Sequence, residues 1–364
     1  MSRIPYALIS DSHNHAWNSF AVDNADGVNS RLQVILDETY RAAQAIKAAG
    51  GKTLFHGGDL FHVRGKIAPS VLNPTVDLYK KLVEEGFDVI INAGNHDLEG
   101  KNSTRLGSAV TALESIGCTV VNEPRIITLG THHVVVVVPW HDKVPELKAA
   151  IESMGVKVRA SILGGTEVDL LIHAPVDGVI PGLPDHGLDN AWLASLGYNR
   201  VFSGHYHNFK DFGNGVYSIG ALTHHTWSDV NSKAGFLISD DTGVSYNATH
   251  APGFIEIDAS TDPAEIPLIV PGNYVKVKID SNKTSDIAAV RQLMNDSGAK
   301  GVIILPQAKP AAAPRVGSTV KAGQSLEGSV AAYIDGKSIE NADFKDKLNA
   351  LCGDILSTVK ASAA

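Results

Sequence analysis

The sequence predicts an α/β protein in which two packed β-sheets are flanked by helices, followed by a small β-α-β unit and a C-terminal helix. Three observations lead to this fold class. Short apolar runs alternate with longer amphipathic stretches over residues 1–92, the pattern of a βαβαβ unit with a parallel sheet. The middle of the chain then holds more strand-like runs than one doubly wound sheet needs, which favours an α-β-β-α sandwich. The composition changes after about residue 252, which indicates an accessory domain.

The elements of the first part follow from their periodicity. Residues 6–10 (YALIS) form a short apolar run typical of a buried strand. Residues 29–49 carry apolar side chains at helical spacing and end at two glycines, which predicts a helix. The same reasoning predicts further strands at 53–56, 88–92, 132–140, 168–173, 200–203, 216–219 and 235–239, and helices at 69–84 and 108–116.

The C-terminal part divides into three segments. A strand at 274–279, a helix at 285–297 and a strand at 301–305 form the compact β-α-β unit. The stretch 307–317 (QAKPAAAPRVG) has almost no apolar bulk and is typical of a linker. Beyond it, one apolar stripe at helical spacing over 338–360 predicts an amphipathic helix, which either packs on the protein or docks on a partner. The expected boundaries are 1–252, 253–306, 307–325 and 326–364.

Composition excludes several classes of protein. The chain has 364 residues and a net charge of −8, so it is not a uniformly basic nucleic-acid wrapper, although a local basic patch remains possible. Its two cysteines, Cys118 and Cys352, are too few for a disulfide scaffold or a CxxC metal knot. We find neither a signal-peptide core nor an apolar stretch long enough to span a membrane. We expect a protein of the bacterial or phage-infected host cytoplasm.

Side chains able to bind metal follow successive predicted strands. They share a position at the carboxyl end of a strand, with glycines beside several of them: Asp11, His13, Asp59, Asn95, His173, His205 and His207. Because the carboxyl ends of such strands meet at one crevice, we expect these side chains to converge there. Glycine lets the backbone turn sharply and brings the ligands close.

This set of residues suits two-metal hydrolysis of a phosphate ester. Two divalent ions about 3.5–4 Å apart can activate water and neutralise phosphoryl oxygens, and one carboxylate must lie between them. One ion would take Asp11, His13 and His207; the other would take Asn95, His173 and His205, with Asp59 between them. Mixed imidazole and carboxylate donors favour manganese, iron or zinc over calcium. His141 is a rival of His173 as a ligand, because it also follows a strand-like run.

The motifs, in this order, resemble the calcineurin-like metallophosphoesterases. They are Asp-x-His at 11–13, Gly-Asp at 58–59, Gly-Asn-His-Asp at 94–97, a lone histidine at 173 and Gly-His-x-His at 204–207. Two segments, GDLFH at 58–62 and GALTHHTWSDVNSKAGFLI at 220–238, resemble the SbcD branch, the bacterial counterpart of the meiotic-recombination-eleven nuclease. The resemblance covers residues 4–240 and implies a metallophosphoesterase sandwich, with a capping domain after it.

The resemblance also implies roles for residues and partners. His96 would be the general acid, Asp97 would orient it, and His62 would help to position the phosphate. His15 would be an outer ligand support or face the substrate, and His224-His225 would shape the rim. The tail beyond the capping domain would bind an SbcC-type ATPase, and a homodimer is possible. The cofactors would be two divalent ions, Mn²⁺ in our interpretation, with Fe or Zn as alternatives.

Four cations lie on loops expected to border the metals: Arg64 and Lys66 after GDLFH, and Lys101 and Arg105 after GNHD. They either contact DNA phosphates or are ordinary solvated loop charges. The sequence thus predicts a two-metal DNA nuclease of the SbcD type, acting in DNA repair, recombination or end processing with an SbcC-type ATPase. The alternatives are a small-molecule metallophosphodiesterase acting on nucleotides or cyclic nucleotides, and a non-catalytic scaffold for DNA ends.

Overall fold

The first large sheet consists of four parallel strands and an antiparallel pair at one edge. The computed structural model describes residues 3–280, 286–307, 325–337, 339 and 341–363. The strand order is β12-β11-β1-β2-β3-β4. The strands are β1 (Tyr6–Ile9), β2 (Thr53–His56), β3 (Asp88–Asn92), β4 (Thr119–Val121), β11 (Gly235–Asp240) and β12 (Gly243–Ala248). Strands β1 to β4 run parallel, and β11 pairs antiparallel with both β1 and β12.

The second large sheet has the order β5-β6-β7-β8-β10-β9. Its strands are β5 (Arg125–Gly130), β6 (His133–Val138), β7 (Glu167–His173), β8 (Arg200–Gly204), β9 (Lys210–Asp211) and β10 (Val216–Ser218). The four inner strands are parallel, and β5 and β9 are antiparallel edges. Parallel strands buried on both faces are near-continuous apolar runs, as the valines at 134–138 illustrate.

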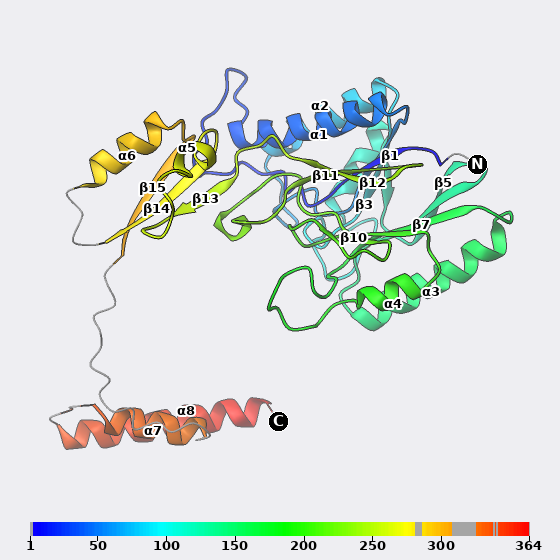
Figure 1. The fold of residues 1–364 in the computed structure, drawn as a ribbon. Coiled ribbons are helices and arrows are strands. Elements are labelled where there is room, and N and C mark those ends of the chain that lie inside the picture. The colour runs from blue at the N-terminus through cyan, green and yellow to red at the C-terminus, as the bar shows by residue number, and fades with distance from the viewer. Residues whose placement is uncertain (1–2, 281–285, 308–324, 338, 340, 364) are drawn as a thin grey trace. The chain divides into compact units, whose positions relative to one another are not determined.

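Helices cover the outer faces of both sheets (Figure 1). The first sheet packs against α1 (Ser30–Ala48), α2 (Pro69–Glu84) and the 3-10 helix η1 (Ala109–Ile116) through an apolar cluster that includes Ile9, Leu36 and Leu82. The second packs against α3 (Val144–Ser161) and α4 (Asn190–Ser195). A third cluster, with Phe55 and Phe202 among its largest side chains, lies between the sheets. The predicted α-β-β-α sandwich is therefore confirmed.

Local chemistry sets the helix starts. The side-chain oxygen of Asn29 accepts the backbone N–H groups of Arg31 and Leu32 and caps α1. Pro69 occupies the first position of α2, where the missing N–H has no intrahelical partner to lose. The stretch 108–116, predicted as a helix, forms the 3-10 helix η1 and ends at Gly117, whose φ of 99° permits the reversal into β4.

A third, smaller sheet follows residue 252, with the order β13-β14-β15. It comprises β13 (Phe254–Ile257), β14 (Tyr274–Asp280) and β15 (Gly301–Gln307), with α5 (Ile266–Ile269) and α6 (Ile287–Asp296) beside it. The predicted β-α-β unit is present, and β13 is an additional strand that the sequence pattern did not reveal. The small sheet up to residue 305 belongs to the same compact unit as the two large sheets, so a domain boundary at 252 stays a prediction.

The C-terminal segment forms a second compact unit with two helices. They are α7 (Leu326–Asp335) and α8 (Ala342–Ala363), which contact each other. A single helix was predicted here; α7 was missed because its Gly, Ser and Ala residues leave only a short apolar stripe. Most of the predicted linker, 307–325, lies outside the described residues. Within the described part of the chain, none of the helices has the length and apolarity needed to cross a membrane.

Candidate metal centre

The carboxyl ends of β1, β2, β3, β7 and β8 meet, and the seven predicted ligands lie together there. Asp11, His13 and His207 form the first cluster, in which one potential ligand atom from each lies within 4.8 Å of the others. The Nε2 atoms of His13 and His207 are 3.2 Å apart. Asp11 is fully buried and His13 is nearly so. These donors face one another in the way that ligands surround a cation.

The second cluster contains Asp59, His173 and His205, again within 4.8 Å of one another. The Oδ1 atom of Asn95 lies 3.1 Å from a ring nitrogen of each histidine. Asp59 reaches both clusters, because its Oδ1 is 3.4 Å from His173 Nε2 and its Oδ2 is 3.8 Å from His13 Nε2. Its position between the clusters is the one that the sequence predicted for a bridging carboxylate.

The backbone at the ligand positions is strained. Asp11, His13, Asp59 and His205 have φ values of 48°, 45°, 56° and 113°, in the region that L-residues rarely adopt. Side chains held in such conformations cluster at functional sites, where the surrounding structure enforces them. The strain therefore accompanies the metal-binding geometry and singles out four of the seven ligands.

Glycines provide the space that the ligands need. A Cβ atom on Gly58 would lie 2.2 Å from His173 Nδ1, and one on Gly94 would lie 2.3 Å from Asp59 Oδ1. Both distances are far below any real carbon contact. The glycines of the Gly-Asp and Gly-Asn-His-Asp motifs are thus required by the close approach of backbone to ligand side chains.

Three residues hydrogen-bond to the ligands of the first cluster: Asp229 and Ser10, which the sequence analysis missed, and His225, which was expected at the rim. Asp229 accepts the Nδ1–H of His207 at 2.8 Å, a carboxylate–imidazole pair typical of metal-bound histidine. The side chain of Ser10 donates to Asp11 Oδ2 at 2.5 Å. The ring of His225 donates from Nε2 to the backbone carbonyl of Asp11 at 2.9 Å. The only sequence signal for Asp229 was its place in the HHTWSD segment.

The pKa shifts divide the ligand histidines into two pairs. Burial raises the pKa of Asp11 to about 6, and burial lowers the pKa of His205 to about 3 and that of His13 well below its usual range. Burial also disfavours charge on the other two, but Asp59 raises the pKa of His173 to about 9 and Asp229 raises that of His207. Neutral imidazole is the form that binds metal, so these two rings would give up a proton to a bound cation. Burial alone would raise the pKa of Asp59, but the neighbouring His173 holds it well below the usual range. A cation bound here would replace the attraction between Asp59 and protonated His173.

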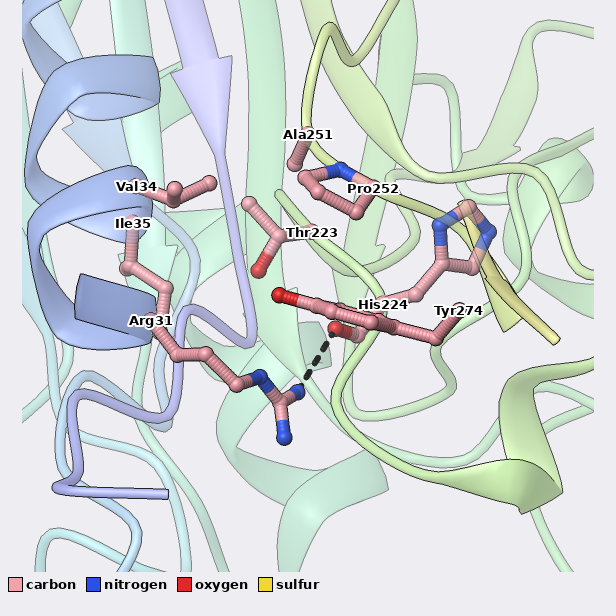
Figure 2. Close-up of a pocket in the computed structure, with 8 residues that line it drawn as sticks. All are labelled: Arg31, Val34, Ile35, Thr223, His224, Ala251, Pro252 and Tyr274. Atoms are coloured by element: carbon pink, nitrogen blue, oxygen red, sulfur yellow. Dashed lines mark hydrogen bonds between the residues drawn. The ribbon is translucent and has the colours of Figure 1, made fainter. Parts of the chain in front are cut away.

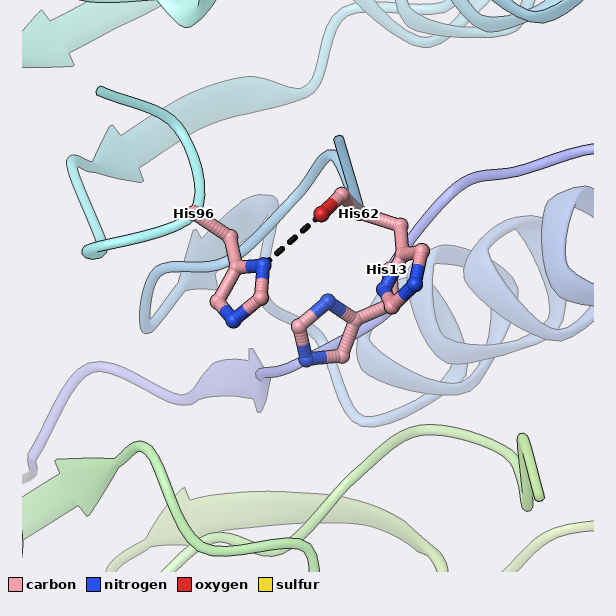
Figure 3. Close-up of side chains that lie close together, drawn as sticks. All are labelled: His13, His62 and His96. Atoms are coloured by element: carbon pink, nitrogen blue, oxygen red, sulfur yellow. Dashed lines mark hydrogen bonds between the residues drawn. The ribbon is translucent and has the colours of Figure 1, made fainter. Parts of the chain in front are cut away.

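A third group of imidazoles, His13, His62 and His96, borders the first cluster (Figure 3). His96 Nδ1 lies 2.7 Å from the backbone carbonyl of His62, to which it donates. Asp97 was expected to orient His96, and the structure differs. The carboxylate of Asp97 accepts the backbone N–H groups of Phe61 and Gly94 at 2.9 Å, so it organises the loops that carry the two histidines.

The remaining histidines lie outside the two clusters. His141 Nδ1 approaches its own chain at the Pro139 carbonyl, 2.9 Å away, whereas His173 lies within the second cluster. His15 packs its ring 5.1 Å from that of His62. His224 Nε2 contacts the carbonyl of Ser232 at 3.1 Å. His224 therefore lies apart from the ligands, while its neighbour supports Asp11.

The four candidate DNA-contacting cations differ in their partners. Arg105 pairs with Glu114, at 2.5 Å, and Lys101 approaches Asp142 at 3.7 Å. Arg64 and Lys66 are exposed, and among the described residues neither has a carboxylate within 4.0 Å. Their charges are therefore more available to a polyanion than those of Lys101 and Arg105.

Comparison with known proteins found one curated relative and several solved structures that resemble parts of this chain. Exonuclease subunit 1 of Enterobacteria phage T4 is 25% identical over 210 residues, 56% of this chain and 58% of the phage protein, so the match spans less than two thirds of that relative. A dimetal phosphatase from Danio rerio aligns at 12% identity and a TM-score of 0.38, over 66% of this chain and 93% of that one. A Thermus thermophilus protein aligns at 10% identity and a TM-score of 0.44, over 68% and 99%.

A family model described as calcineurin-like phosphoesterase matches residues 4–209, more than half of the chain. This range includes all seven candidate ligands and the glycines that make room for them. On this match, the chain belongs to the calcineurin-like phosphoesterase family.

Proposed function

We propose that this protein is a two-metal-dependent DNA nuclease of the SbcD type. The observation that carries the proposal is the pair of ligand clusters joined by Asp59 at the carboxyl ends of the strands. Family membership supports a metal-dependent phosphoester hydrolase. The similarity to a phage protein named as an exonuclease subunit supports DNA as the substrate and a role in repair, recombination or end processing.

The donor set fits two divalent ions. The first would be held by Asp11, His13 and His207, and the second by His173, His205 and Asn95, with Asp59 between them. Such ions supply Lewis-acid activation of water and neutralisation of phosphoryl charge. Imidazole and oxygen donors together suit Mn²⁺, our choice, as well as Fe and Zn.

His96 is proposed as the general acid. Its ring centroid lies 4.8 Å from that of His13, beside the first cluster. Because Nδ1 donates to the carbonyl of His62, the proton given to the leaving oxygen must be carried on Nε2 of the doubly protonated ring. The ring of His62 is nearly parallel to that of His96, with centroids 5.7 Å apart, and would face the phosphate from the same side.

The C-terminal helices are proposed to bind an SbcC-type ATPase. They expose large apolar side chains that an isolated helix pair leaves in water: Leu326, Tyr333, Phe344, Leu351 and Ile355, each more than half exposed. An amphipathic helix of this kind docks its apolar face into a groove of a partner. Phe344→Asp is expected to abolish capture of a purified SbcC-type ATPase while leaving Mn²⁺-dependent hydrolysis unchanged.

The first test is cleavage of end-labelled single- and double-stranded DNA with Mn²⁺, beside bis-p-nitrophenyl phosphate as a generic diester. We expect DNA loss that Asp59→Ala abolishes together with metal binding. His96→Ala should keep both metal ions and lose most turnover, since it removes the acid and no ligand. His250→Ala, at an exposed histidine outside the clusters, is the matched control.

The outcomes separate the candidate functions. Turnover of the small diester with intact DNA would favour a phosphodiesterase for nucleotides, unless the ATPase restored cutting. Metal binding without turnover of either substrate would favour a scaffold for DNA ends. Parent-rate cleavage by His96→Ala would exclude His96 as the acid.

A further inference from the structure

Arg31 is a buried cation whose place in the fold needs an explanation. It lies in the first turn of α1 and is 6% exposed. A positive charge is disfavoured at a helix N-terminus by the helix dipole. Within the described part of the chain, no carboxylate lies within 4.0 Å of its guanidinium. A buried, unpaired charge is costly unless other groups stabilise it.

Backbone carbonyls provide the first stabilisation. The guanidinium donates to the carbonyl of His225 at 2.6 Å, to that of His224 at 3.4 Å and to that of Ser19 at 3.5 Å. Figure 2 shows Arg31 reaching from α1 toward the chain at His224, with Tyr274 beside it. The cavity at this junction measures about 10 Å³, roughly the space of one water, so the parts are closely packed.

Three aromatic rings provide the second stabilisation of the Arg31 charge. The guanidinium carbon lies 5.3 Å from the ring centre of Trp17, 5.2 Å from that of Phe254 and 5.4 Å from that of Tyr274. These are cation–π distances, and such contacts strengthen when the cation is desolvated. Phe254 belongs to β13 and Tyr274 to β14, so the small sheet contributes two of the three rings.

The segment 224–229, to which Arg31 donates hydrogen bonds, also contacts the ligands of the first metal cluster. His225 donates from its ring to the carbonyl of Asp11, and its own N–H is accepted by Asp229 at 2.8 Å. Asp229 in turn accepts the Nδ1–H of His207. Two of the three ligands in the first cluster therefore depend on residues 224–229, whose carbonyls Arg31 binds. The second cluster has no corresponding contact with Arg31 among the described residues.

We propose that Arg31 is a positioning residue that sets the affinity of the first metal cluster, and that the small sheet takes part in this through the rings of Phe254 and Tyr274. The inference rests on the two-metal centre of the proposed function. On this proposal, β13 and β14 influence metal binding without touching the metal. Their rings contact Arg31, Arg31 contacts His225, and His225 contacts Asp11.

Arg41 provides a matched control in the same helix. It too contacts a backbone carbonyl, that of Ala248 at 2.8 Å, and an aromatic ring, that of Phe236 at 4.7 Å. It also pairs with Glu38 and makes no contact with the 224–229 segment. Loss of its side chain should lower stability without reaching the metal ligands.

The test is equilibrium titration of Mn²⁺ on the full chain, with free Mn²⁺ followed by electron paramagnetic resonance. The parent should bind two equivalents. Arg31→Gln is expected to raise the Kd of one Mn²⁺ ion about 10- to 100-fold, the range found when a residue that hydrogen-bonds to a metal ligand is replaced. The Kd of the other ion should stay within about threefold of the parent value. Arg31→Lys should restore part of the affinity because it keeps the charge, and Phe254→Leu should weaken the same equivalent by a smaller factor. Arg41→Gln should leave both unchanged.

A second variant identifies the affected ion. His205→Ala, which removes a ligand of the second cluster, should leave one tight equivalent, and adding Arg31→Gln should weaken that one. Equal loss of both equivalents in Arg31→Gln, or affinities like those of the parent, would overturn the proposal. Because the readout is metal binding, a failure to cut DNA refutes the nuclease assignment alone, whereas unchanged binding in Arg31→Gln refutes only the role of Arg31.

Discussion

Replacing Gly58 by alanine should damage the second metal cluster without removing any ligand. The new Cβ would lie 2.2 Å from His173 Nδ1, whereas real Cβ atoms stay beyond 3.0 Å. The imidazole must therefore move by about 0.8 Å, and His173 cannot yield easily because it is fully buried and donates to the carbonyl of Gly57. Misplacement of a catalytic element by about 1 Å costs roughly 100-fold in rate, and we expect a loss of that order.

Backbone strain must be separated from this displacement. Gly58 has a φ of +112°, so alanine there also costs about 1–3 kcal/mol of stability. Gly86→Ala is the control, because Gly86 has a φ of +88° and nothing within 4 Å of its added Cβ. Both variants should melt earlier in circular dichroism, and Gly58→Ala by more, because the displacement of His173 adds to the backbone strain that the two share. Only Gly58→Ala should lose hydrolysis of bis-p-nitrophenyl phosphate at saturating Mn²⁺, and activity within threefold of the parent in a folded Gly58→Ala protein would refute the reasoning.

Two further predictions concern parts of the protein away from the metal centre. Arg3→Ala should lower the free energy of unfolding by about 3 kcal/mol, measured by urea denaturation. The reason is that Asp169 is fully buried and lies 2.5 Å from the Arg3 guanidinium, so the variant leaves this carboxylate without its main counter-charge. A loss below about 1 kcal/mol would contradict this. Burial raises the pKa of the Cys118 thiol to about 12, so its reactive thiolate is scarce below that pH and increases only as pH rises toward it. At pH 8, Ellman's reagent should therefore modify only Cys352 in the native chain and both thiols in urea; rapid reaction of both in the native chain would be inconsistent with the buried site.

Most of the sandwich could be predicted because its elements carry their own periodic signals. β2, α2 and β3 begin and end at the predicted residues, since buried parallel strands are apolar throughout and α2 has a proline at its start. The elements that were missed include the helices α3 and α4 and the strand β12, besides β9 and β13. β13 is held by pairing with β14 and by its ring contacts, and β9 has only two residues, so tertiary contacts rather than local pattern decide them.

The candidate ligands could be predicted because glycines and strand ends mark them in the sequence. The residues that hydrogen-bond to the ligands could not be predicted. Asp229 looks like a turn residue in sequence, and its capping-box contacts in the 3-10 helix at 227–229 give no sign that it also accepts from His207, 22 positions earlier. Asp97 shows the converse case: the family resemblance implied that it orients His96, but its carboxylate accepts hydrogen bonds from loop backbone instead. Neighbours in sequence are poor guides to hydrogen-bond partners when the chain turns sharply.

The left-handed backbone at Asp11, His13, Asp59 and His205 has a consequence for protein engineering. Each of these conformations costs about 1–3 kcal/mol that glycine would avoid, at the expense of the hydrogen bonds that the side chain makes. Heat resistance of the metal-free protein therefore does not by itself select for the four ligands. Any stabilising programme has to hold these four positions constant, and metal retention is the appropriate counter-screen.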